Sequence, residues 1–243
     1  MTGYTTWKGD YDYMSIIKFK NVSKKYGKND VLKNINFSIE EGTITGMVGP
    51  NGAGKTTIFK LIANFMHASQ GEIYYNGAEI EKADRREIGF LVENPKLDYN
   101  LSAYDNLKLL TILTETEDDE YINRVLRVIG LESAKGKKVK EFSLGMKQRL
   151  GIGMAIVTKP KLIILDEPLN GLDPEGIVSI RKSLIALNEE WGITILISSH
   201  MLTELNKLAQ NYIFIANGEI KEEIEASKIP GDIEEYYMEK IVK

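Results

Sequence analysis

The chain has 243 residues, 43% of them hydrophobic and 27% charged, with a formal net charge of −4. This fits one large globular domain or two small ones, and it excludes an intrinsically disordered chain. The chain has no cysteine and two histidines, and the absence of cysteine excludes a disulfide framework, a thiolate metal site and a cysteine nucleophile. With 35 acidic against 31 basic residues, the composition gives no sign of nucleic-acid binding. The longest apolar runs, such as Leu162–Leu165, are far shorter than the ~20 residues that span a bilayer, so we expect a soluble, cytosolic chain.

Residues 1–13 show neither helical nor strand periodicity, and they lack the basic start and apolar centre of a secretion signal. We therefore expect them to lie outside the fold, as a leader or a tag remnant. Codons for Lys8, Gly9 and Asp10 can contain a ribosome-binding sequence, and Met14 follows at a workable spacing. Our hypothesis is that Met14 is the natural start, and mass spectrometry of the protein from its native host tests it.

Strand and helix patterns alternate in the first part of the chain. Strands are predicted at Ile16–Val22, Ile35–Glu40, Thr43–Val48, Gly71–Tyr75, Ala78–Ile80 and Ile88–Val92, and a helix at Lys55–Ala63. Turn signals at Gly27–Asp30 and at Asn76 and Gly77 predict two antiparallel connections. From Ser102 to Ile156 the pattern is helical, and its charged runs, Glu115–Glu120 and Lys135–Lys140, are expected to be solvated.

Strand patterns resume in the last third of the chain. Leu162–Leu165 and Ile193–Ser198 are apolar throughout or nearly so, and a helix is predicted between them at Pro174–Glu189. Tyr212–Ala216 and Glu219–Glu223 predict a closing hairpin. Continuous apolar strands separated by helices are typical of a buried parallel sheet, so we predict an α/β fold.

A phosphate-binding loop is the strongest motif. Gly49–Thr56 (GPNGAGKT) matches all of G-x-x-x-x-G-K-[ST], between a predicted strand and a predicted helix, which is the context that the motif requires. Its backbone N–H groups and the helix N-terminus would point at phosphates, Lys55 would supply positive charge, and Thr56 a hydroxyl for Mg²⁺. We predict that a nucleoside triphosphate binds to Gly49, Pro50, Asn51, Gly52, Ala53, Gly54, Lys55, Thr56 and Thr57.

A second motif is the apolar run Leu162–Leu165 followed by Asp166 and Glu167. At the end of its strand, Asp166 is placed to hold Mg²⁺, directly or through water, and Glu167 to polarise the attacking water. On its own such a pair is usually a solvated strand end. With a phosphate loop upstream, the catalytic interpretation is favoured, and with it hydrolysis rather than nucleotide sensing alone.

The run Phe142–Leu150 (FSLGMKQRL) resembles the signature motif of ATP-binding-cassette (ABC) ATPases, L-S-G-G-Q-x-Q-R. Leu169–Asp173 resembles the D-loop of that family, His200 its switch histidine, and Tyr26 the aromatic residue that stacks on adenine. The resemblance covers roughly Ile16 to Glu223, with the motifs in the right order. The cofactors that it implies are ATP and Mg²⁺.

The resemblance implies a P-loop NTPase with a mixed, mainly parallel core sheet, an antiparallel β-subdomain and an inserted helical subdomain. The expected division of the chain is 14–97 for the nucleotide-binding core and β-subdomain, 98–156 for the helical signature subdomain, 157–224 for the rest of the core, and 225–243 for a C-terminal tail or helix.

The resemblance also implies a head-to-tail dimer with a second copy or a homologous cassette. Ser143 and Gly145 of one subunit would close over the γ-phosphate bound to Lys55 of the other, so an isolated monomer should hydrolyse ATP poorly. His200 would contact the γ-phosphate, and Asp173 would help to join the subunits. His67, in a turn-like stretch, has no such context, and we expect it to be an ordinary surface or core residue.

Two departures from the family pattern indicate which branch of the family the chain resembles. Leu144 and Met146 stand where the signature most often has glycine and glutamine, and Glu93 stands where a glutamine usually reaches Mg²⁺. A carboxylate at Glu93 could still bind Mg²⁺, but it adds negative charge near the other two carboxylates. Both departures, and Ser143–Ile152 above all, resemble the bacitracin-resistance and lantibiotic self-protection branch.

The implied function is the ATPase subunit of a peptide-antibiotic exporter, at the cytoplasmic face of a membrane, with a separate permease that contacts Glu93–Tyr104 and the helical insertion. The alternatives are the cassette of another exporter, for drugs, lipids or ions, and a soluble cassette protein that acts on ribosomes or DNA. The latter usually carry two cassettes or long coiled coils. A P-loop kinase leaves Ser143–Arg149 unexplained, and the complete set of catalytic residues disfavours a non-hydrolysing regulatory cassette.

Overall fold

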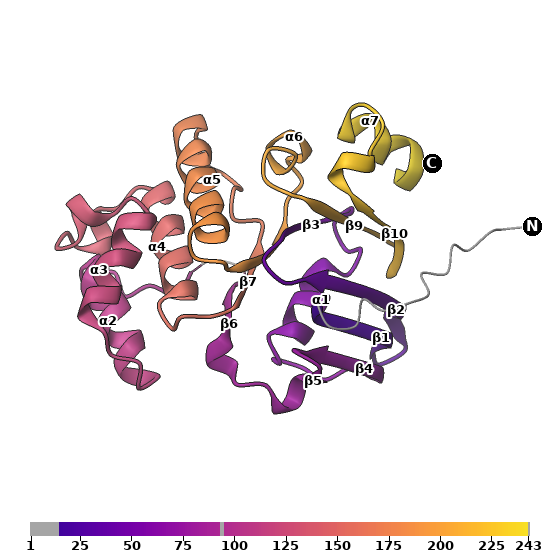
Figure 1. Ribbon diagram of the computed structural model, residues 1–243, viewed down its shortest axis with the longest axis horizontal. Helices are drawn as coiled ribbons and strands as arrows, with labels where there is room; N and C mark the ends of the chain where they lie inside the picture. The colour runs from indigo at the N-terminus through magenta and orange to yellow at the C-terminus, as the bar shows by residue number, and fades with distance from the viewer. Residues whose placement is uncertain (1–14, 93–94, 243) are drawn as a thin grey trace, which may run out of the picture.

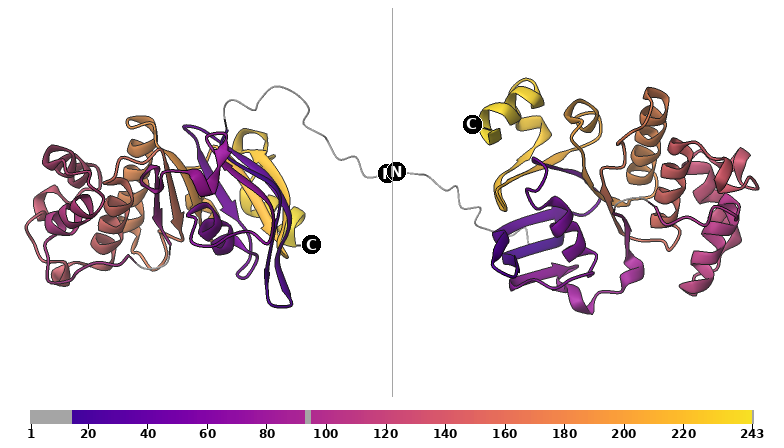
Figure 2. Two further views of the ribbon diagram at one scale, coloured as in Figure 1. Left: turned by 90° about the horizontal axis from the view of Figure 1, so that it is seen from below. Right: turned by 180° about the vertical axis from the view of Figure 1, so that it is seen from behind.

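The computed structural model describes residues 15–92 and 95–242, so the predicted metal ligand Glu93 and the leader 1–13 lie outside the described residues. Helices α2 to α4 gather at one end of the molecule and an antiparallel sheet at the other, with a mainly parallel sheet between them (Figure 1). Figure 2 shows the same arrangement from two further sides. In the part of the chain that the structure describes, no helix is both long enough and apolar enough to cross a bilayer.

The elements follow the predicted order. The strands are β1 Ser15–Tyr26, β2 Asn29–Glu40, β3 Ile44–Val48, β4 Gln70–Tyr75, β5 Ala78–Glu79, β6 Ile88–Leu91, β7 Leu162–Asp166, β8 Thr194–Ser198, β9 Asn211–Ala216 and β10 Glu219–Glu225. The α-helices are α1 Lys55–Ile62, α2 Ala103–Leu113, α3 Asp119–Val128, α4 Leu144–Ile156, α5 Pro174–Glu189, α6 Leu202–Leu205 and α7 Ile233–Tyr237. Short 3-10 turns occupy Ile80–Lys82, Arg85–Glu87, Glu132–Ala134, Val139–Glu141 and Ala226–Lys228, and a π-turn occupies Met238–Val242.

The core sheet has the strand order β10-β9-β3-β8-β7-β6, and every neighbouring pair except β10-β9 is parallel. Both of its faces are buried. On β7, Ile163 and Leu165 belong to the hydrophobic core on the side of the helical insertion, whereas Leu162 and Ile164 belong to the core on the other side. This confirms the predicted parallel α/β sheet and explains its continuous aliphatic strands.

The second sheet has the order β2-β1-β4-β5 and is antiparallel throughout. Its buried face shares one hydrophobic core with α1 and with one face of the core sheet. Phe19 on β1 and Phe37 on β2 stack with their ring centroids 4.4 Å apart. Helix α1 is thereby fixed between the two sheets by Ile58, Phe59, Leu61 and Ile62, so the loop that precedes it is held from both sides.

The helical insertion between β6 and β7 contains α2, α3 and α4, as predicted for Ser102 to Ile156. Ser102, Asp118 and Ser143 cap these helices by accepting a hydrogen bond from the N–H group three residues on. The lysines of the run Lys135–Lys140 are exposed, which confirms that this run is solvated. The domain boundaries expected from the sequence stay a prediction.

The structure extends the predicted elements in a few places. Strand β1 continues to Tyr26 and strand β2 already begins at Asn29. The turn between them is tighter than the expected turn cluster because Gly27 adopts a φ of 58°. The Asn76 and Gly77 pair, with φ of 47° and 75°, makes the predicted primed turn, and Asn217 and Gly218 do the same. The short helix α6 has no individual prediction, because so few residues carry little periodic signal. Helix α7 lies in 225–243, the range expected to form a C-terminal tail or helix.

Candidate nucleotide-binding and catalytic site

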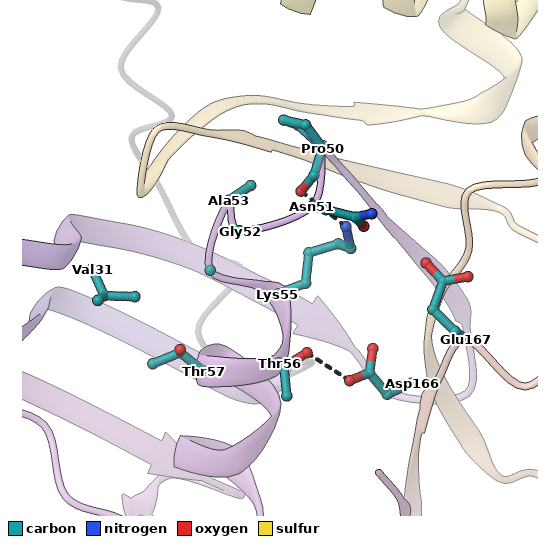
Figure 3. A pocket seen from close by; sticks show the side chains of 11 residues that line it. Val31, Pro50, Asn51, Gly52, Ala53, Lys55, Thr56, Thr57, Asp166 and Glu167 are labelled. Atoms are coloured by element: carbon teal, nitrogen blue, oxygen red, sulfur yellow. Dashed lines mark hydrogen bonds between the residues drawn. The ribbon is translucent and has the colours of Figure 1, made fainter. Parts of the chain in front are cut away.

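The candidate site lies at the carboxyl ends of three adjacent parallel strands, β3, β8 and β7. The loop that follows β3 carries the phosphate-binding motif, and β7 ends in the two carboxylates. In an open α/β sheet, ligands bind outside the carboxyl ends of the strands. The pocket there is lined by Val31, Pro50, Asn51, Gly52, Ala53, Gly54, Lys55, Thr56, Thr57, Asp166 and Glu167 (Figure 3).

The phosphate loop needs its glycines for two physical reasons. Gly54 has a φ of 113°, which residues with a side chain rarely adopt, and a Cβ there would lie 2.5 Å from Leu32 Cδ2. A Cβ at Gly49 would lie 2.1 Å from the carbonyl oxygen of Ile215 on β9. The loop is therefore packed against both sheets, and it ends directly at the N-terminus of α1, where backbone N–H groups favour anions.

Lys55 is folded back onto this loop. Its Nζ donates hydrogen bonds to the carbonyl oxygens of Gly49, at 2.5 Å, and Pro50, at 3.2 Å. The residue is only 8% exposed. Burial lowers the pKa of its ammonium group, and the negative charges of Glu167 and Asp166 oppose that effect. The loop thus holds a desolvated cation, which is well suited to bind phosphate oxygens.

Thr56 and Asp166 are joined across the pocket. The Thr56 hydroxyl donates to Asp166 Oδ2 at 2.7 Å, as Figure 3 shows. Both are hard oxygen ligands of the kind that Mg²⁺ prefers, and Mg²⁺ usually keeps several waters in addition to a few protein and phosphate oxygens. Within the described ranges no three His, Asp or Glu side chains gather as a metal site. The Thr56 hydroxyl and the Asp166 carboxylate fit a Mg²⁺ ion that is shared with triphosphate oxygens and water.

Glu167 and His200 form a pair beside these groups. Both the ring Nδ1 of His200, at 2.8 Å, and its backbone N–H, at 3.2 Å, lie against Glu167 Oε2. An ionised carboxylate only accepts hydrogen bonds, so Nδ1 carries the proton in this arrangement. Glu167 itself has φ of 51°, in the left-handed region. Its backbone N–H donates to the hydroxyl of Ser198 on β8 at 2.9 Å.

Tyr26, the predicted adenine-stacking residue, does not line this pocket. It ends β1 with 48% of its surface exposed, and its hydroxyl donates to the sulfur of Met66 at 3.1 Å. Val31 on β2 lines the pocket instead, and the sequence analysis missed it because no motif marks this residue. It reaches the site because Gly54 packs closely against Leu32.

The predicted signature and D-loop residues also lie outside this pocket but close to each other. Exposed Ser143 caps α4 by accepting from the N–H of Met146 at 3.2 Å, and Asp173 caps α5 by accepting from the N–H of Gly176 at 2.8 Å. A Cβ on Gly145 would lie 3.8 Å from Gly176 Cα, so the two segments adjoin.

His67 bears out the ordinary surface role expected of it. Its side chain is 75% exposed, and its ring Nδ1 lies 3.8 Å from a carboxylate oxygen of Glu81. Nothing in the geometry connects it with the pocket.

The site combines a phosphate loop that holds a buried lysine, a hydroxyl–carboxylate pair and a glutamate–histidine pair. On a sheet of this topology, this combination defines a P-loop nucleoside triphosphatase. Comparison with known proteins gives the family. The model of the ABC transporter family matches residues 32–170.

The chain is 43% identical over 205 residues to the lantibiotic transport ATP-binding protein SrtF of Streptococcus pyogenes, covering 84% of this chain and 89% of that protein. It is 38% identical over 217 residues to the bacitracin transport ATP-binding protein BcrA of Enterococcus faecalis, covering 88% and 70%. A dimeric post-hydrolysis structure of the ATP-binding cassette MJ0796, bound to ADP and Pi, is similar with a TM-score of 0.76 and 28% identity, covering 86% and 98%. The chain belongs to the ABC transporter family, as an ATP-binding and ATP-hydrolysing cassette, and the suspected resemblance to the lantibiotic and bacitracin branch is confirmed.

Proposed function

We propose that this cassette hydrolyses MgATP to power a separate membrane permease that exports a peptide antibiotic or confers immunity to it. The observation that carries the hydrolytic part is the Glu167–His200 pair, 2.8 Å apart, beside the Lys55 loop. The transported class is supported by the relatives, which are lantibiotic and bacitracin transport ATP-binding proteins. We further propose that the cassette works at the cytoplasmic face of the membrane.

The chemistry follows from the groups in the pocket. The triphosphate lies along the loop, where N–H groups, the start of α1 and Lys55 stabilise its negative charge. The Thr56 hydroxyl and the Asp166 carboxylate would hold Mg²⁺, which would neutralise charge on the phosphate oxygens. Glu167 accepts a proton from the attacking water as general base. Both hydrogen bonds from His200 go to Oε2, so we assign Oε1 as the proton acceptor.

The proposed active unit is a head-to-tail dimer with a second copy or a homologous cassette. Ser143 and Gly145 lie at the N-terminus of the 13-residue helix α4, outside the pocket of their own chain, where they are free to face a partner's γ-phosphate. The MJ0796 cassette, similar in fold, is dimeric with ADP and Pi. In this dimer Asp173 joins the subunits. The half-exposed ring of Tyr26 stacks on the adenine.

The permease is proposed to contact Glu93–Tyr104 together with the helical insertion. Exposed apolar side chains support this: Tyr99 is 49% exposed, and on α2 Leu109, Ile112 and Leu113 are 45%, 48% and 72% exposed. Apolar side chains gathered on one helix face mark an interaction site more often than scattered ones do.

The test of the proposed function is Glu167→Gln, which keeps the size of the side chain and removes its basicity. We expect ATP binding to be retained, hydrolysis to fall by about a thousandfold, and a dimer to persist with ATP, because the closed state no longer turns over. Glu189→Gln, an exposed glutamate at the end of α5, is the matched control and should turn over normally.

In the native host, deletion of the gene for this chain should raise susceptibility to a peptide antibiotic. The wild-type gene should restore resistance, and the Glu167→Gln variant should not. Normal turnover by Glu167→Gln would refute the assignment of the base. Unchanged susceptibility to peptide antibiotics would instead favour the cassette of a drug, lipid or ion exporter.

A further inference from the structure

The side chain of Ser198 lies between the two carboxylate residues of the site. Ser198 is the last residue of β8, is fully buried, and is the register partner of Asp166 on β7. Its hydroxyl donates to Asp166 Oδ1 at 2.6 Å and accepts from the backbone N–H of Glu167 at 2.9 Å. One buried hydroxyl therefore touches both of the residues on which metal binding and proton transfer depend.

The directions of these two hydrogen bonds are fixed by chemistry. A backbone N–H only donates, so the Ser198 oxygen is the acceptor from Glu167, and the hydroxyl hydrogen is left for Asp166 Oδ1. Asp166 Oδ2 already accepts from Thr56 at 2.7 Å. Both oxygens of the carboxylate thus have a partner, and its rotation is determined from two sides. A residue without a hydroxyl at position 198 leaves two polar groups without this partner.

The contact matters most for Glu167, because its backbone is in an uncommon conformation. A φ of 51° is disfavoured for a residue with a side chain by about 1–2 kcal/mol. The bond from its N–H to Ser198, and the bond that its carbonyl oxygen accepts from the Asn170 N–H at 3.1 Å, hold the residue in this conformation. The conformation turns the side chain toward His200, which lies two residues beyond Ser198.

We propose that Ser198 is a positioning residue for ATP hydrolysis: its hydroxyl orients the Asp166 carboxylate toward the metal position and fixes the Glu167 backbone, so that the base points at the attacking water. The proposal rests on the proposed roles of Asp166 and Glu167. It adds that β8 and the residues that follow it supply four hydrogen bonds to Asp166 and Glu167, two through Ser198 and two through His200. Ser198 itself does not line the pocket.

The test uses the full chain at a protein concentration at which the wild type hydrolyses ATP. For Ser198→Ala, kcat should fall about a hundredfold, since misplacing a reacting group by about 1 Å costs that much. The affinity for ATP without divalent cation should stay within about twofold, because Lys55 and the loop are untouched. The affinity for Mn²⁺, measured by its electron paramagnetic resonance signal with a non-hydrolysable ATP analogue, should fall about tenfold, because Asp166 loses one of its two orienting bonds.

Two further variants separate positioning from mere packing. Ser198→Thr keeps the hydroxyl and should restore kcat to within a few-fold of wild type. Ser183→Ala is the matched control, because this buried hydroxyl on α5 also bonds a main-chain group, the carbonyl oxygen of Val128 at 2.8 Å, far from the pocket. It should leave kcat and Mn²⁺ affinity unchanged. If Ser198→Ala does not fold, the near-isosteric Ser198→Cys replaces it, with the same expected loss of kcat.

Normal kcat and Mn²⁺ affinity in a folded Ser198→Ala or Ser198→Cys variant would overturn the proposal. So would an equal loss of kcat in Ser198→Ala and Ser198→Thr when both bind ATP normally. Glu167→Gln is measured in parallel. If it turns over normally, the proposed base is wrong whatever Ser198 does; if it is inactive while Ser198→Ala is normal, only the role of Ser198 is wrong.

Discussion

The ion pair between Arg181 and Glu204 links α5 to α6, the helix that begins two residues after His200. Arg181 Nη1 lies 2.5 Å from Glu204 Oε2, and the two side chains are only 21% and 17% exposed. Lys207 contacts the other oxygen of the same carboxylate at 2.6 Å, but its side chain is 53% exposed. Replacing Arg181 by methionine keeps the aliphatic length of the side chain and removes its charge.

The magnitude lies between two limits. Breaking a buried pair costs about 3–5 kcal/mol, and an exposed pair contributes about 0–1 kcal/mol. Here the pair is largely but not completely buried, and Lys207 still neutralises Glu204 after the substitution. We therefore expect Arg181→Met to lower the free energy of unfolding by about 1–2 kcal/mol. Lys207→Met, the matched control on the same acid, should cost less than about 0.5 kcal/mol because water screens an exposed ammonium.

The pH dependence follows from the carboxylate. The bond from Lys207, and then the charges of Lys207 and Arg181, hold the pKa of Glu204 below its ordinary value of 4.5. A carboxylate with a lowered pKa in the folded state stabilises the fold fully above the unfolded value, and the contribution is lost as the pH falls through the folded value. The difference between wild type and Arg181→Met should therefore be constant near pH 7 and shrink below pH 4.5.

The assay is urea unfolding of a double-mutant cycle with Arg181→Met, Glu204→Gln and the double variant. A coupling energy of about 1 kcal/mol is expected for two side chains in direct contact. Strict additivity of the two single variants would refute the reasoning, as would a larger loss from Lys207→Met than from Arg181→Met. The cycle also tests whether the segment that carries His200 is anchored to α5.

Two other predictions concern the phosphate loop. Gly54→Ala should weaken ATP binding and lower the free energy of unfolding by about 2 kcal/mol or more, because φ is 113° and the new Cβ would lie 2.5 Å from Leu32 Cδ2. The control Gly192→Ala, where φ is 68° and the space is open, should lower it by only about 1 kcal/mol. Equal losses for the two variants in calorimetry and urea unfolding would contradict this account. Because burial lowers the pKa of Lys55, ATP affinity should decline with rising pH before the usual lysine pKa of 10.5 is reached, as the ammonium loses its charge. Fluorescence titration with a labelled ATP analogue measures this, and Lys55→Met should be weak and independent of pH; a parallel decline in that variant would contradict the assignment.

Local sequence was sufficient for most of the fold. The aliphatic runs of β7 and β8 and the spacing of α5 are local signals, and so is the phosphate loop, since all its residues are contiguous. The approach of Thr56 to Asp166 followed from placing a strand end near a phosphate loop. Two features escaped prediction because they depend on contacts between segments that are distant in the sequence, which no local pattern encodes: Val31 in the pocket, and Ser198 against Asp166. A serine at the end of an apolar strand indicates only that the strand ends there, until the neighbouring strand is known.

Strand β3, which carries the phosphate loop, has both of its hydrogen-bonded neighbours in the last third of the chain, β8 and β9. During synthesis on the ribosome, β3 and its loop therefore emerge about 150 residues before the partners that bury them, and at about 5–20 residues per second this is a delay of roughly 7–30 s. Through that interval the apolar strand has two open edges, and the core sheet cannot close. We therefore expect the N-terminal half of this cassette to be prone to aggregation until the C-terminal third that completes its core sheet has been made.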